Sequence, residues 1–250
     1  MTPAAPQIIA HRGASSEAPE NTITAYRTAL AIGVHGVELD VNLSSDGEVM
    51  VIHDHVLERT TDGHGPVGAR TLGELRQLDA GLWFGEAFAG ERLPTLAEAL
   101  DVLRAVRVIV EIKAGLGRTP GIAARVAAVI RASTHRNVTV SSFDHPLLVE
   151  VTAALPELDI AVLYTARPIH ALRLAQDAGA RTLQPYWFWL TPDVVTSAHA
   201  AGLRVETWVV DEPADQSRVI AIGVDAIMTN YPRRLRETFA ALQLPLPSPR

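Results

Sequence analysis

Hydrophobic and polar residues follow two different periods along this chain. Short, nearly continuous apolar runs, bounded by turn-forming residues, are typical of strands that are buried on both faces of a sheet. Between them lie longer segments in which apolar residues recur every three or four positions, as on one face of a helix. Because nearly every strand-like run is followed by a helix-like segment, the pattern predicts an α/β fold with parallel strands.

About eight such strand–helix units fit into the 250 residues. Strands are predicted at Gln7–Ala10, Val37–Val41, Val49–Ile52, Val108–Ile112, Val138–Ser142, Ile160–Tyr164, Thr182–Gln184, Arg204–Val210 and Ala226–Thr229. Helices are predicted at Ile23–Ile32, Ile122–Ala132, Pro146–Ala154, Ile169–Ala178, Pro192–Ala201, Pro213–Ile222 and Pro232–Leu242. This arrangement indicates a (β/α)8 TIM barrel. The alternative, an open doubly wound sheet, is less favoured because no Gly-rich phosphate-binding sequence follows any strand.

Residues 54–94 do not follow the alternation. A Gly- and Thr-rich stretch comes after His53, Thr71 and Glu74 have the spacing of a capping box before a short helix, and a second capped helix runs from Thr95 to about Leu103. We interpret 54–94 as an insertion after the second strand of a single domain, residues 1–242. Residues 243–250 are rich in proline, which predicts a loose tail.

The segment His35–His55 has the most unusual pattern. Glu38 and Asp40 alternate with apolar residues, so the two carboxylates share one face of a strand, and a second strand after a turn ends beside His53. The segment is either a sheet edge with solvated acids or half of a metal site with an acid/base group next to it. Active sites of (β/α)8 barrels lie at the C-terminal ends of the strands, which favours the second interpretation.

Composition narrows the classes of function. The chain is 48% hydrophobic and 20% charged, enough to bury a full core. A net charge of −6 argues against a nucleic-acid-binding protein, but not against a small anionic substrate, because a metal and a few cations can reverse the field in one pocket. The chain has no cysteine, no apolar run long enough to span a membrane and no basic N-terminal targeting region. We therefore expect a soluble cytoplasmic protein without stable membrane insertion. The sequence does not indicate its oligomeric state.

Polar and aromatic side chains gather at the predicted C-terminal ends of the strands. They are His11, Arg12, Glu38, Asp40, His53, Glu111, Lys113, Ser142, Gln184, Trp208 and Asn230. Charged groups in apolar strands are costly to bury without partners. Their placement around one end of a barrel predicts that they interact with one another or with a cation.

Three of these residues, Glu38, Asp40 and Glu111, offer carboxylates from neighbouring strands. Hard oxygen donors of this type suit one divalent cation, Mg²⁺ or Ca²⁺, rather than zinc. In the alternative interpretation the acids pair with Arg12 and Lys113 as salt bridges at the barrel mouth.

Two histidines and one lysine complete the candidate chemistry. His11 and His53 flank the acids and are the best acid/base candidates, because imidazole titrates near neutral pH. Lys113 is the single lysine among 22 lysine and arginine residues, and a compact charge there would suit a phosphate oxygen. The aromatic run Trp187–Trp189 either packs in the core or lines the lip of a pocket, where it could accept an apolar chain or a choline-like cation.

With these residues, the chain resembles the glycerophosphodiester phosphodiesterase family from about Ile8 to Leu235. The resemblance rests on AHRGASSEAPENT, GVELDVNLSSDGEVMVIHD, LERTTDGHG, ERLPTLAEAL, VEIKAG, SSFD, TWVV and GVDAIMTNYP, in that order. The chain departs from the family at Trp208–Asp211, where WTVN is frequent, and at Thr229–Pro232, where TDxP is frequent. The second departure replaces an acidic strand-end group by Asn230.

The resemblance implies a barrel with a small inserted segment after the second strand and a role for each candidate residue. By this resemblance, Glu38, Asp40 and Glu111 hold a divalent cation. His11 and His53 are the general acid/base pair, and Arg12 and Lys113 contact the phosphate. Trp208 lies near the substrate. The implied reaction is hydrolysis of a glycerophosphodiester to glycerol 3-phosphate and an alcohol, with water or a neighbouring glycerol hydroxyl as the nucleophile.

Two other functions remain open. The aromatic run Trp187–Trp189 is compatible with a lysophospholipase D-like enzyme that releases head groups from lysophospholipids. A non-catalytic barrel that only binds phosphodiesters is a further alternative, but the intact pair of histidines argues against it.

Overall fold

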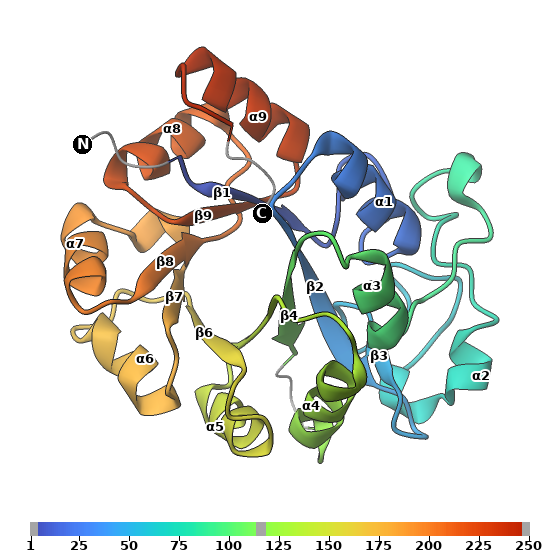
Figure 1. The fold of residues 1–250 in the computed structure, drawn as a ribbon. Coiled ribbons are helices and arrows are strands. Elements are labelled where there is room, and N and C mark those ends of the chain that lie inside the picture. The colour runs from blue at the N-terminus through green and yellow to red at the C-terminus, as the bar shows by residue number, and fades with distance from the viewer. Residues whose placement is uncertain (1–4, 114–118, 247–250) are drawn as a thin grey trace.

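The chain folds into a closed barrel of parallel strands surrounded by helices (Figure 1). This computed structural model describes residues 5–113 and 119–246. Within those ranges nine strands form one sheet, and all but one of them are parallel to their neighbours. The parallel strands are, in chain order, β1 (Gln7–His11), β2 (Gly36–Leu43), β4 (Arg107–Ile112), β5 (Val138–Ser142), β6 (Asp159–Tyr164), β7 (Thr182–Pro185), β8 (Arg204–Thr207) and β9 (Ala226–Thr229). Because β1 pairs with both β2 and β9, the sheet closes, and the predicted (β/α)8 barrel is confirmed.

The helices lie on the outside of the barrel and cover its apolar strands (Figure 1). They are α1 (Ile23–Ile32), α3 (Leu96–Val102), α4 (Ile122–Ala132), α5 (His145–Ala154), α6 (Ala171–Ala178), α7 (Pro192–Ala200), α8 (Pro213–Ile222) and α9 (Pro232–Ala241). The helix starts follow local chemistry: the Thr22 side chain accepts a hydrogen bond from the Ala25 amide, and Thr95 forms a capping box with Glu98. None of the helices in the described ranges is long and apolar enough to cross a membrane.

Several element boundaries differ from the sequence prediction by one to three residues. β8 ends at Thr207 rather than Val210, and beyond it the parallel pairing continues only as an isolated bridge between Tyr186 and Trp208. Helix α6 begins at Ala171 rather than Ile169, because His170 has φ −127° and ψ 69°, outside the helical region.

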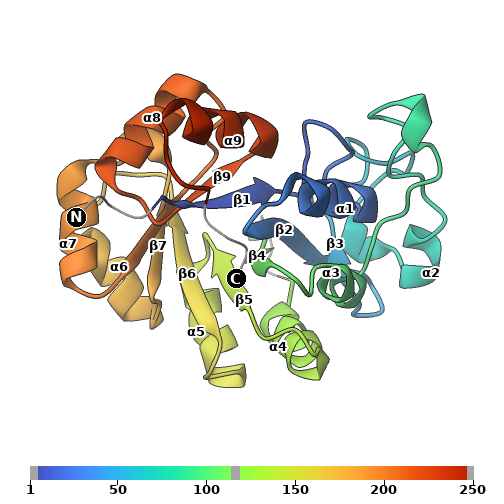
Figure 2. The same cartoon turned by 45° about the horizontal axis from the view of Figure 1, so that its top comes forward.

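The chain between β2 and α3 forms a small structure beside the barrel. The strand β3 (Val49–Val51) pairs antiparallel with β2, as expected for a hairpin. The following segment contains the 3-10 helix Val67–Ala69, the helix α2 (Leu72–Leu75) with its predicted Thr71–Glu74 capping box, and the 3-10 helix Glu86–Phe88. In Figures 1 and 2 this segment lies beyond β3 and α3, on the side of the barrel opposite α6 and α7.

The segment has its own apolar cluster. Its buried members are Met50, Ile52, Leu57, Val67, Leu75, Ala80 and Leu93. The division into one domain over residues 1–242, with an insertion at 54–94, stays a prediction. Residues 247–250 of the predicted tail and Ala114–Gly115 of the VEIKAG motif lie outside the described residues.

An ion pair crosses the interior of the barrel below its mouth. Arg107 of β4 and Glu206 of β8, on opposite strands of the barrel, are joined by an Nη1–Oε1 contact of 2.5 Å and are almost completely buried. The Thr139 hydroxyl accepts a hydrogen bond from Arg107 Nη2 at 2.9 Å, and Gln184 Nε2 donates to Glu206 Oε2 at 3.0 Å. A buried charge pair of this kind depends on having both partners and their hydrogen bonds in place.

Candidate active site

Three buried carboxylates converge at the C-terminal end of the barrel. Glu38 and Asp40 project from the same face of β2, and the register places Asp40 beside Glu111 of β4. One oxygen of each side chain lies within 4.8 Å of the others. The structure therefore brings together the three acids that the sequence selects.

Crowding and burial disturb the ionisation of these acids. Burial raises the pKa of Glu38 well above its usual range, and repulsion from Asp40 and Glu111 adds to the effect. Burial likewise raises the pKa of Glu111 to about 7, although Lys113 opposes the shift. Burial acts to raise the pKa of Asp40 as well, but the cations Lys113 and Arg12 outweigh it and hold that pKa below its usual value. The site therefore carries a concentration of carboxylate oxygens that additional positive charge would stabilise.

The donor set fits a hard divalent cation. Glu38 Oε1 is buried and has no hydrogen-bond partner within residues 5–113 and 119–246, so it is available as a ligand. Carboxylate oxygens from three side chains, without a histidine or thiol among them, match the preference of Mg²⁺ or Ca²⁺.

Two basic side chains already contact the acids. Arg12 Nε lies 3.1 Å from Asp40 Oδ2, while Lys113 Nζ lies 3.2 Å from Asp40 Oδ1 and 2.5 Å from Glu111 Oε1. Arg12 has a φ of 58°, which is unusual for a residue other than glycine, and its amide donates to the Glu38 carbonyl oxygen. The salt bridges and the acidic cluster, which the sequence presents as alternatives, are thus both present.

His11, the last residue of β1, is oriented by residues from the opposite end of the chain. The Asp211 carboxylate accepts a hydrogen bond from Asn230 Nδ2 at 2.8 Å, so the amide oxygen of Asn230 faces His11. That oxygen lies 2.7 Å from His11 Nδ1, which must therefore carry the proton. Burial and the neighbouring Arg12 lower the pKa of His11 to about 4, and Nε2 is left 3.8 Å from Glu38 Oε2.

His53 is oriented by the residue that follows it. Its Nδ1 lies 2.5 Å from Asp54 Oδ1. Hydrogen bonds from Arg59 lower the pKa of Asp54 to about 2, so the carboxylate is ionised and accepts the Nδ1 proton. The backbone of this segment is held by Asn42, whose side-chain amide donates to the Ile52 carbonyl oxygen at 2.9 Å. Both histidines therefore keep Nε2 as the nitrogen available for proton transfer.

The two histidines line one cavity with the acids and the basic residues. The cavity has a volume of about 120 Å³, and its charged wall is formed by His11, Arg12, Glu38, His53, Glu111 and Lys113. Its opposite wall is apolar and includes Phe143, Leu163 and Trp208. Of the other strand-end candidates, Gln184 also lines this cavity, whereas the Ser142 hydroxyl donates to the Ile112 carbonyl oxygen and belongs to the barrel wall.

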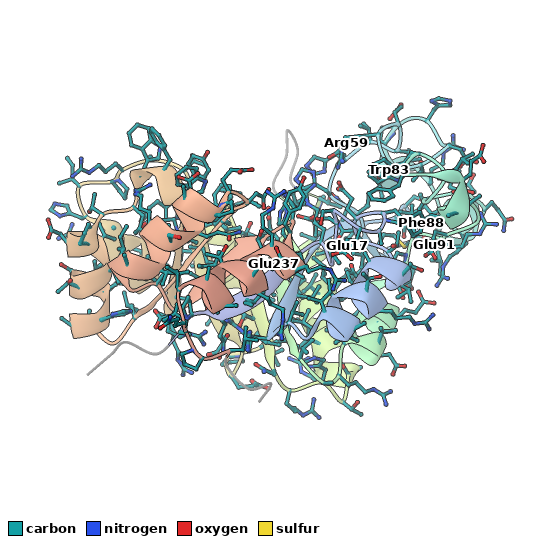
Figure 3. All side chains as sticks on the ribbon, turned by 90° about the horizontal axis from the view of Figure 1, so that it is seen from above. Glu17, Arg59, Trp83, Phe88, Glu91 and Glu237 are labelled. Carbon is teal, nitrogen blue, oxygen red and sulfur yellow. The ribbon has the colours of Figure 1, made fainter. Side chains whose placement is uncertain are left out.

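A chain of ion pairs that sequence reasoning did not single out connects the two sides of the site. Glu20 Oε1 accepts from Arg12 Nη1 at 2.8 Å, and both Glu20 oxygens accept from Arg59 at 2.8 Å. Arg59 Nε also donates to Asp54 Oδ2 at 2.7 Å, which extends the chain to His53. Arg59 belongs to the segment beside the barrel (Figure 3). The available signal was the LERTT motif, which the resemblance includes but which has no periodicity to interpret.

Asn21 supports the acids from behind. It has a φ of 59°, its side-chain amide donates to Asp40 Oδ2 at 2.8 Å, and its amide oxygen accepts from the Tyr26 hydroxyl at 3.3 Å. The contact explains why this asparagine stands directly before helix α1 without being its N-cap, a position that Thr22 occupies.

Aromatic rings form a continuous path from the cavity to the surface. Trp208 Nε1 donates to the Gln184 carbonyl oxygen at 2.8 Å, and the Trp208 ring lies 5.3 Å from that of Tyr186. Tyr186 stacks on Phe188, which contacts Trp189 edge to face. The predicted aromatic run is the short 3-10 helix Trp187–Trp189, in which Phe188 and Trp189 are exposed.

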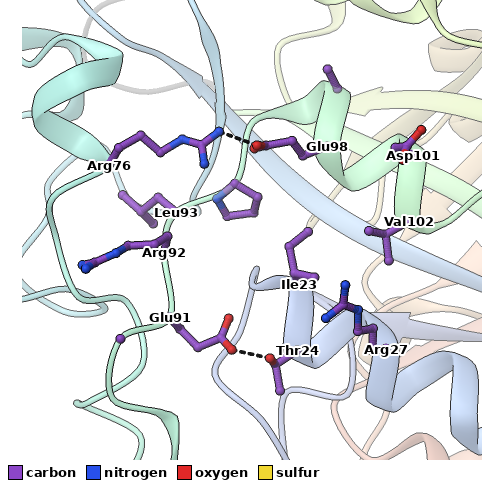
Figure 4. A pocket seen from close by; sticks show the side chains of 13 residues that line it. Ile23, Thr24, Arg27, Arg76, Glu91, Arg92, Leu93, Glu98, Asp101 and Val102 are labelled. Atoms are coloured by element: carbon purple, nitrogen blue, oxygen red, sulfur yellow. Dashed lines mark hydrogen bonds and ion pairs between the residues drawn. The ribbon is translucent and has the colours of Figure 1, made fainter.

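A larger cavity, of about 650 Å³, lies between helices α1 and α3 and residues 90–94 (Figure 4). Its polar groups largely pair with one another: Arg76 with Glu98 at 2.5 Å, and Thr24 with Glu91. It contains neither a histidine nor the acidic cluster, so the chemistry lies in the smaller cavity.

Comparisons with known proteins show the family to which this chain is similar. The sequence model of the Glycerophosphoryl diester phosphodiesterase family matches residues 11–234. A glycerophosphodiester phosphodiesterase from Caldanaerobacter subterraneus is 40% identical over 231 residues, which cover 91% of this chain and 95% of that protein.

Two solved structures have the same fold. A phosphodiesterase from Oleispira antarctica, solved in complex with the product sn-glycerol-3-phosphate, has a TM-score of 0.87 and 30% identity over 94% of this chain and 97% of its own. A glycerophosphodiester phosphodiesterase from Agrobacterium tumefaciens has a TM-score of 0.81 and 32% identity over 94% and 99%.

Proposed function

This chain belongs to the glycerophosphoryl diester phosphodiesterase family and is a glycerophosphodiester phosphodiesterase. We propose that it hydrolyses glycerophosphodiesters to sn-glycerol 3-phosphate and an alcohol with the help of one divalent cation. The observation that carries this proposal is the presence of three buried carboxylates and two oriented imidazoles around a single cavity. The product bound to the Oleispira antarctica relative supports the choice of substrate.

Glu38, Asp40 and Glu111 would hold the cation, Mg²⁺ or Ca²⁺. When bound, such an ion neutralises negative charge on a phosphoryl oxygen and acts as a Lewis acid. Its presence would also relieve the mutual repulsion of the three carboxylates and keep them ionised.

Arg12 and Lys113 would bind the remaining phosphate oxygens. Both line the cavity, and both are already held at its charged wall by Asp40. Fixed cations aimed at the position where charge develops stabilise the transition state without reorganisation. Trp208, on the apolar wall, would contact the substrate from the other side.

The two histidines would move the protons. We assign His53 as the general acid, because the ionised Asp54 at its Nδ1 opposes the lowering of the His53 pKa by burial. We assign His11 as the general base, because a neutral amide holds its Nδ1 and the nearby Arg12 disfavours its protonation. His11 would deprotonate the attacking oxygen, from water or from a neighbouring glyceryl hydroxyl, while His53 protonates the leaving alkoxide.

A second candidate substrate class is lysophospholipids. The observation that favours it is the path of aromatic rings from Trp208 to the exposed Phe188 and Trp189, which could accommodate an acyl chain beyond the cavity. The cytoplasmic location and the absence of nucleic-acid partners stay predictions from the sequence.

Removal of either histidine should slow hydrolysis strongly. With glycerophosphocholine and saturating Mg²⁺, we expect His11→Ala and His53→Ala each to lower kcat by roughly 10²- to 10⁴-fold, the usual contribution of general acid–base catalysis. A p-nitrophenyl ester of glycerol phosphate should restore much of the rate of His53→Ala, but not of His11→Ala, because nitrophenolate leaves without a proton.

The control for the histidine variants is His199→Ala, which removes another histidine paired with an aspartate, 2.9 Å from Asp225, outside the cavity. Its kcat should stay close to that of the wild type. Near wild-type hydrolysis by His11→Ala or His53→Ala would contradict the two-histidine mechanism. If the p-nitrophenyl ester restored the rate of His11→Ala alone, the assignment of acid and base would be reversed.

Loss of a carboxylate from the acidic cluster should weaken metal binding. We expect Glu38→Gln to lower Mg²⁺ or Ca²⁺ affinity by at least roughly tenfold, measured by calorimetry, and EDTA to abolish activity of the wild type. Glu98→Gln, which changes an acid on α3, should leave the affinity unchanged. Full activity in EDTA together with unchanged cation affinity of Glu38→Gln would contradict the metal assignment.

Arg59 should support turnover although it does not line the cavity. Without it, Asp54 and Glu20 lose a shared partner and His53 and Arg12 are less well positioned, so Arg59→Ala should lower kcat by roughly 10- to 100-fold. Arg59→Lys should recover only part of this loss, because an ammonium group cannot bridge two carboxylates in the same planar geometry.

The control for Arg59 is Arg70→Ala, which removes an arginine of similar exposure from the same segment; the side chains are 43% and 47% exposed, respectively. Equal kcat values for the Arg59→Ala and Arg70→Ala variants would show that the chain of ion pairs has no effect on catalysis.

The lysophospholipid alternative is separated by comparing glycerophosphocholine with lysophosphatidylcholine. If the aromatic path binds acyl chains, kcat/KM for the lysophospholipid should equal or exceed that for glycerophosphocholine, and Phe188→Ala should lower only the former. Hydrolysis of glycerophosphocholine alone, unaffected by Phe188→Ala, would exclude this alternative.

A further inference from the structure

Resting on the proposed function, we infer that the side-chain oxygen of Gln184 accepts a hydrogen bond from a hydroxyl group of the substrate's glyceryl moiety. Gln184 would then be a specificity-determining residue that selects glyceryl phosphodiesters from other phosphodiesters. The inference concerns the floor of the cavity, away from the acids and histidines that carry the proposed chemistry.

Gln184 is placed to meet a ligand although it is completely buried in the protein. It lies on β7 at the C-terminal end of the barrel and lines the active-site cavity with Leu163 of β6 and Met228 of β9. The Trp208 indole donates to its backbone carbonyl oxygen, which ties this residue to the aromatic wall.

The orientation of the Gln184 amide follows from its neighbour. Its Nε2 lies 3.0 Å from Glu206 Oε2, and Glu206 is paired with both Arg107 and Arg204. An ionised carboxylate can only accept hydrogen bonds, so the amide nitrogen must face Glu206 and the amide oxygen must point away from it. The buried ion pair across the barrel thus fixes the orientation of the Gln184 amide, with the nitrogen bound to Glu206 and the oxygen unpaired.

The amide oxygen of Gln184 has no hydrogen-bond partner among the residues that the structure describes. It is buried and accepts no hydrogen bond, whereas most buried polar groups in proteins are paired. The other fully buried glutamine, Gln216 of α8, is satisfied at both ends: its Nε2 donates to the Val210 and Asp211 carbonyl oxygens, and its Oε1 accepts from Thr238. The two buried glutamines thus differ in whether the amide oxygen is paired, and Gln184 is the one that lines the active-site cavity.

The chemistry of this oxygen defines the group that it can bind. A phosphate oxygen is an acceptor and cannot donate a hydrogen bond to it, so the phosphate belongs with Arg12 and Lys113 at the charged wall. A neutral O–H donor satisfies the oxygen without placing a charge beside Leu163 and Met228. The glyceryl moiety carries two such hydroxyls, and a site that binds a substrate hydroxyl discriminates against analogues that lack it.

The experiment measures binding to the cation-loaded protein by calorimetry. The probes are sn-glycerol 3-phosphate, the monophosphates of 1,2-propanediol and 1,3-propanediol, each of which lacks one glyceryl hydroxyl, and inorganic phosphate. For the wild type, removal of the bound hydroxyl should weaken binding by roughly 10- to 100-fold, the effect of leaving one buried acceptor unpaired. A loss below about threefold for both propanediol phosphates would overturn the inference without any variant.

The variant Gln184→Met removes the amide and keeps the length of the side chain. It should abolish the difference between glycerol phosphate and the discriminated analogue while leaving the affinity for inorganic phosphate unchanged. Gln216→Met, the matched change of the satisfied glutamine, should keep the wild-type discrimination. Retention of the discrimination by Gln184→Met would overturn the inference.

Activity and binding separate this inference from the proposed function. If the wild type hydrolyses glycerophosphodiesters but shows no hydroxyl discrimination, only the role of Gln184 fails. If it hydrolyses none of them, the proposed function fails and this inference falls with it.

Discussion

The active site depends on holding three carboxylates close together in a buried position, shielded from solvent. Glu38, Asp40 and Glu111 are buried within 4.8 Å of one another at the barrel mouth, and their repulsion must be offset by positive charge. Arg12 and Lys113 supply part of it through Asp40. The unpaired oxygen of Glu38 is where a bound cation would add further positive charge. The proposed cation would therefore offset the same repulsion that Arg12 and Lys113 reduce.

A second group of buried charges lies in the interior of the barrel, below the active-site cavity, and contacts it through Gln184. Arg107 and Glu206 pair across the barrel below the cavity, and Glu206 accepts from the amide of Gln184 on the cavity floor. The charged pair orients the amide, and in the proposed role the amide oxygen accepts a hydrogen bond from the ligand. A group that looks purely structural thus helps to set the chemistry of the floor.

The two imidazoles are oriented from different parts of the chain and by groups of different charge. His53 is held by the ionised Asp54, itself fixed by Arg59 of the segment beside the barrel, whereas His11 is held by the neutral amide of Asn230. An anion behind one ring and a neutral group behind the other give the pair unequal tendencies to hold a proton. That inequality is what an acid and a base working together require.

The sequence alone was sufficient for features that depend on local periodicity. The alternation of strand and helix patterns determined the barrel, and the i, i+2 spacing of Glu38 and Asp40 determined that they share a face, because both follow from backbone geometry. The family resemblance added the order of the site residues. Contacts between distant segments were decided only by closure of the barrel: Asn230 meets His11 across 219 positions, and Glu206 meets Arg107 across 99. The unpaired oxygen of Gln184 likewise depends on which groups surround a side chain in three dimensions, which no period in the chain records.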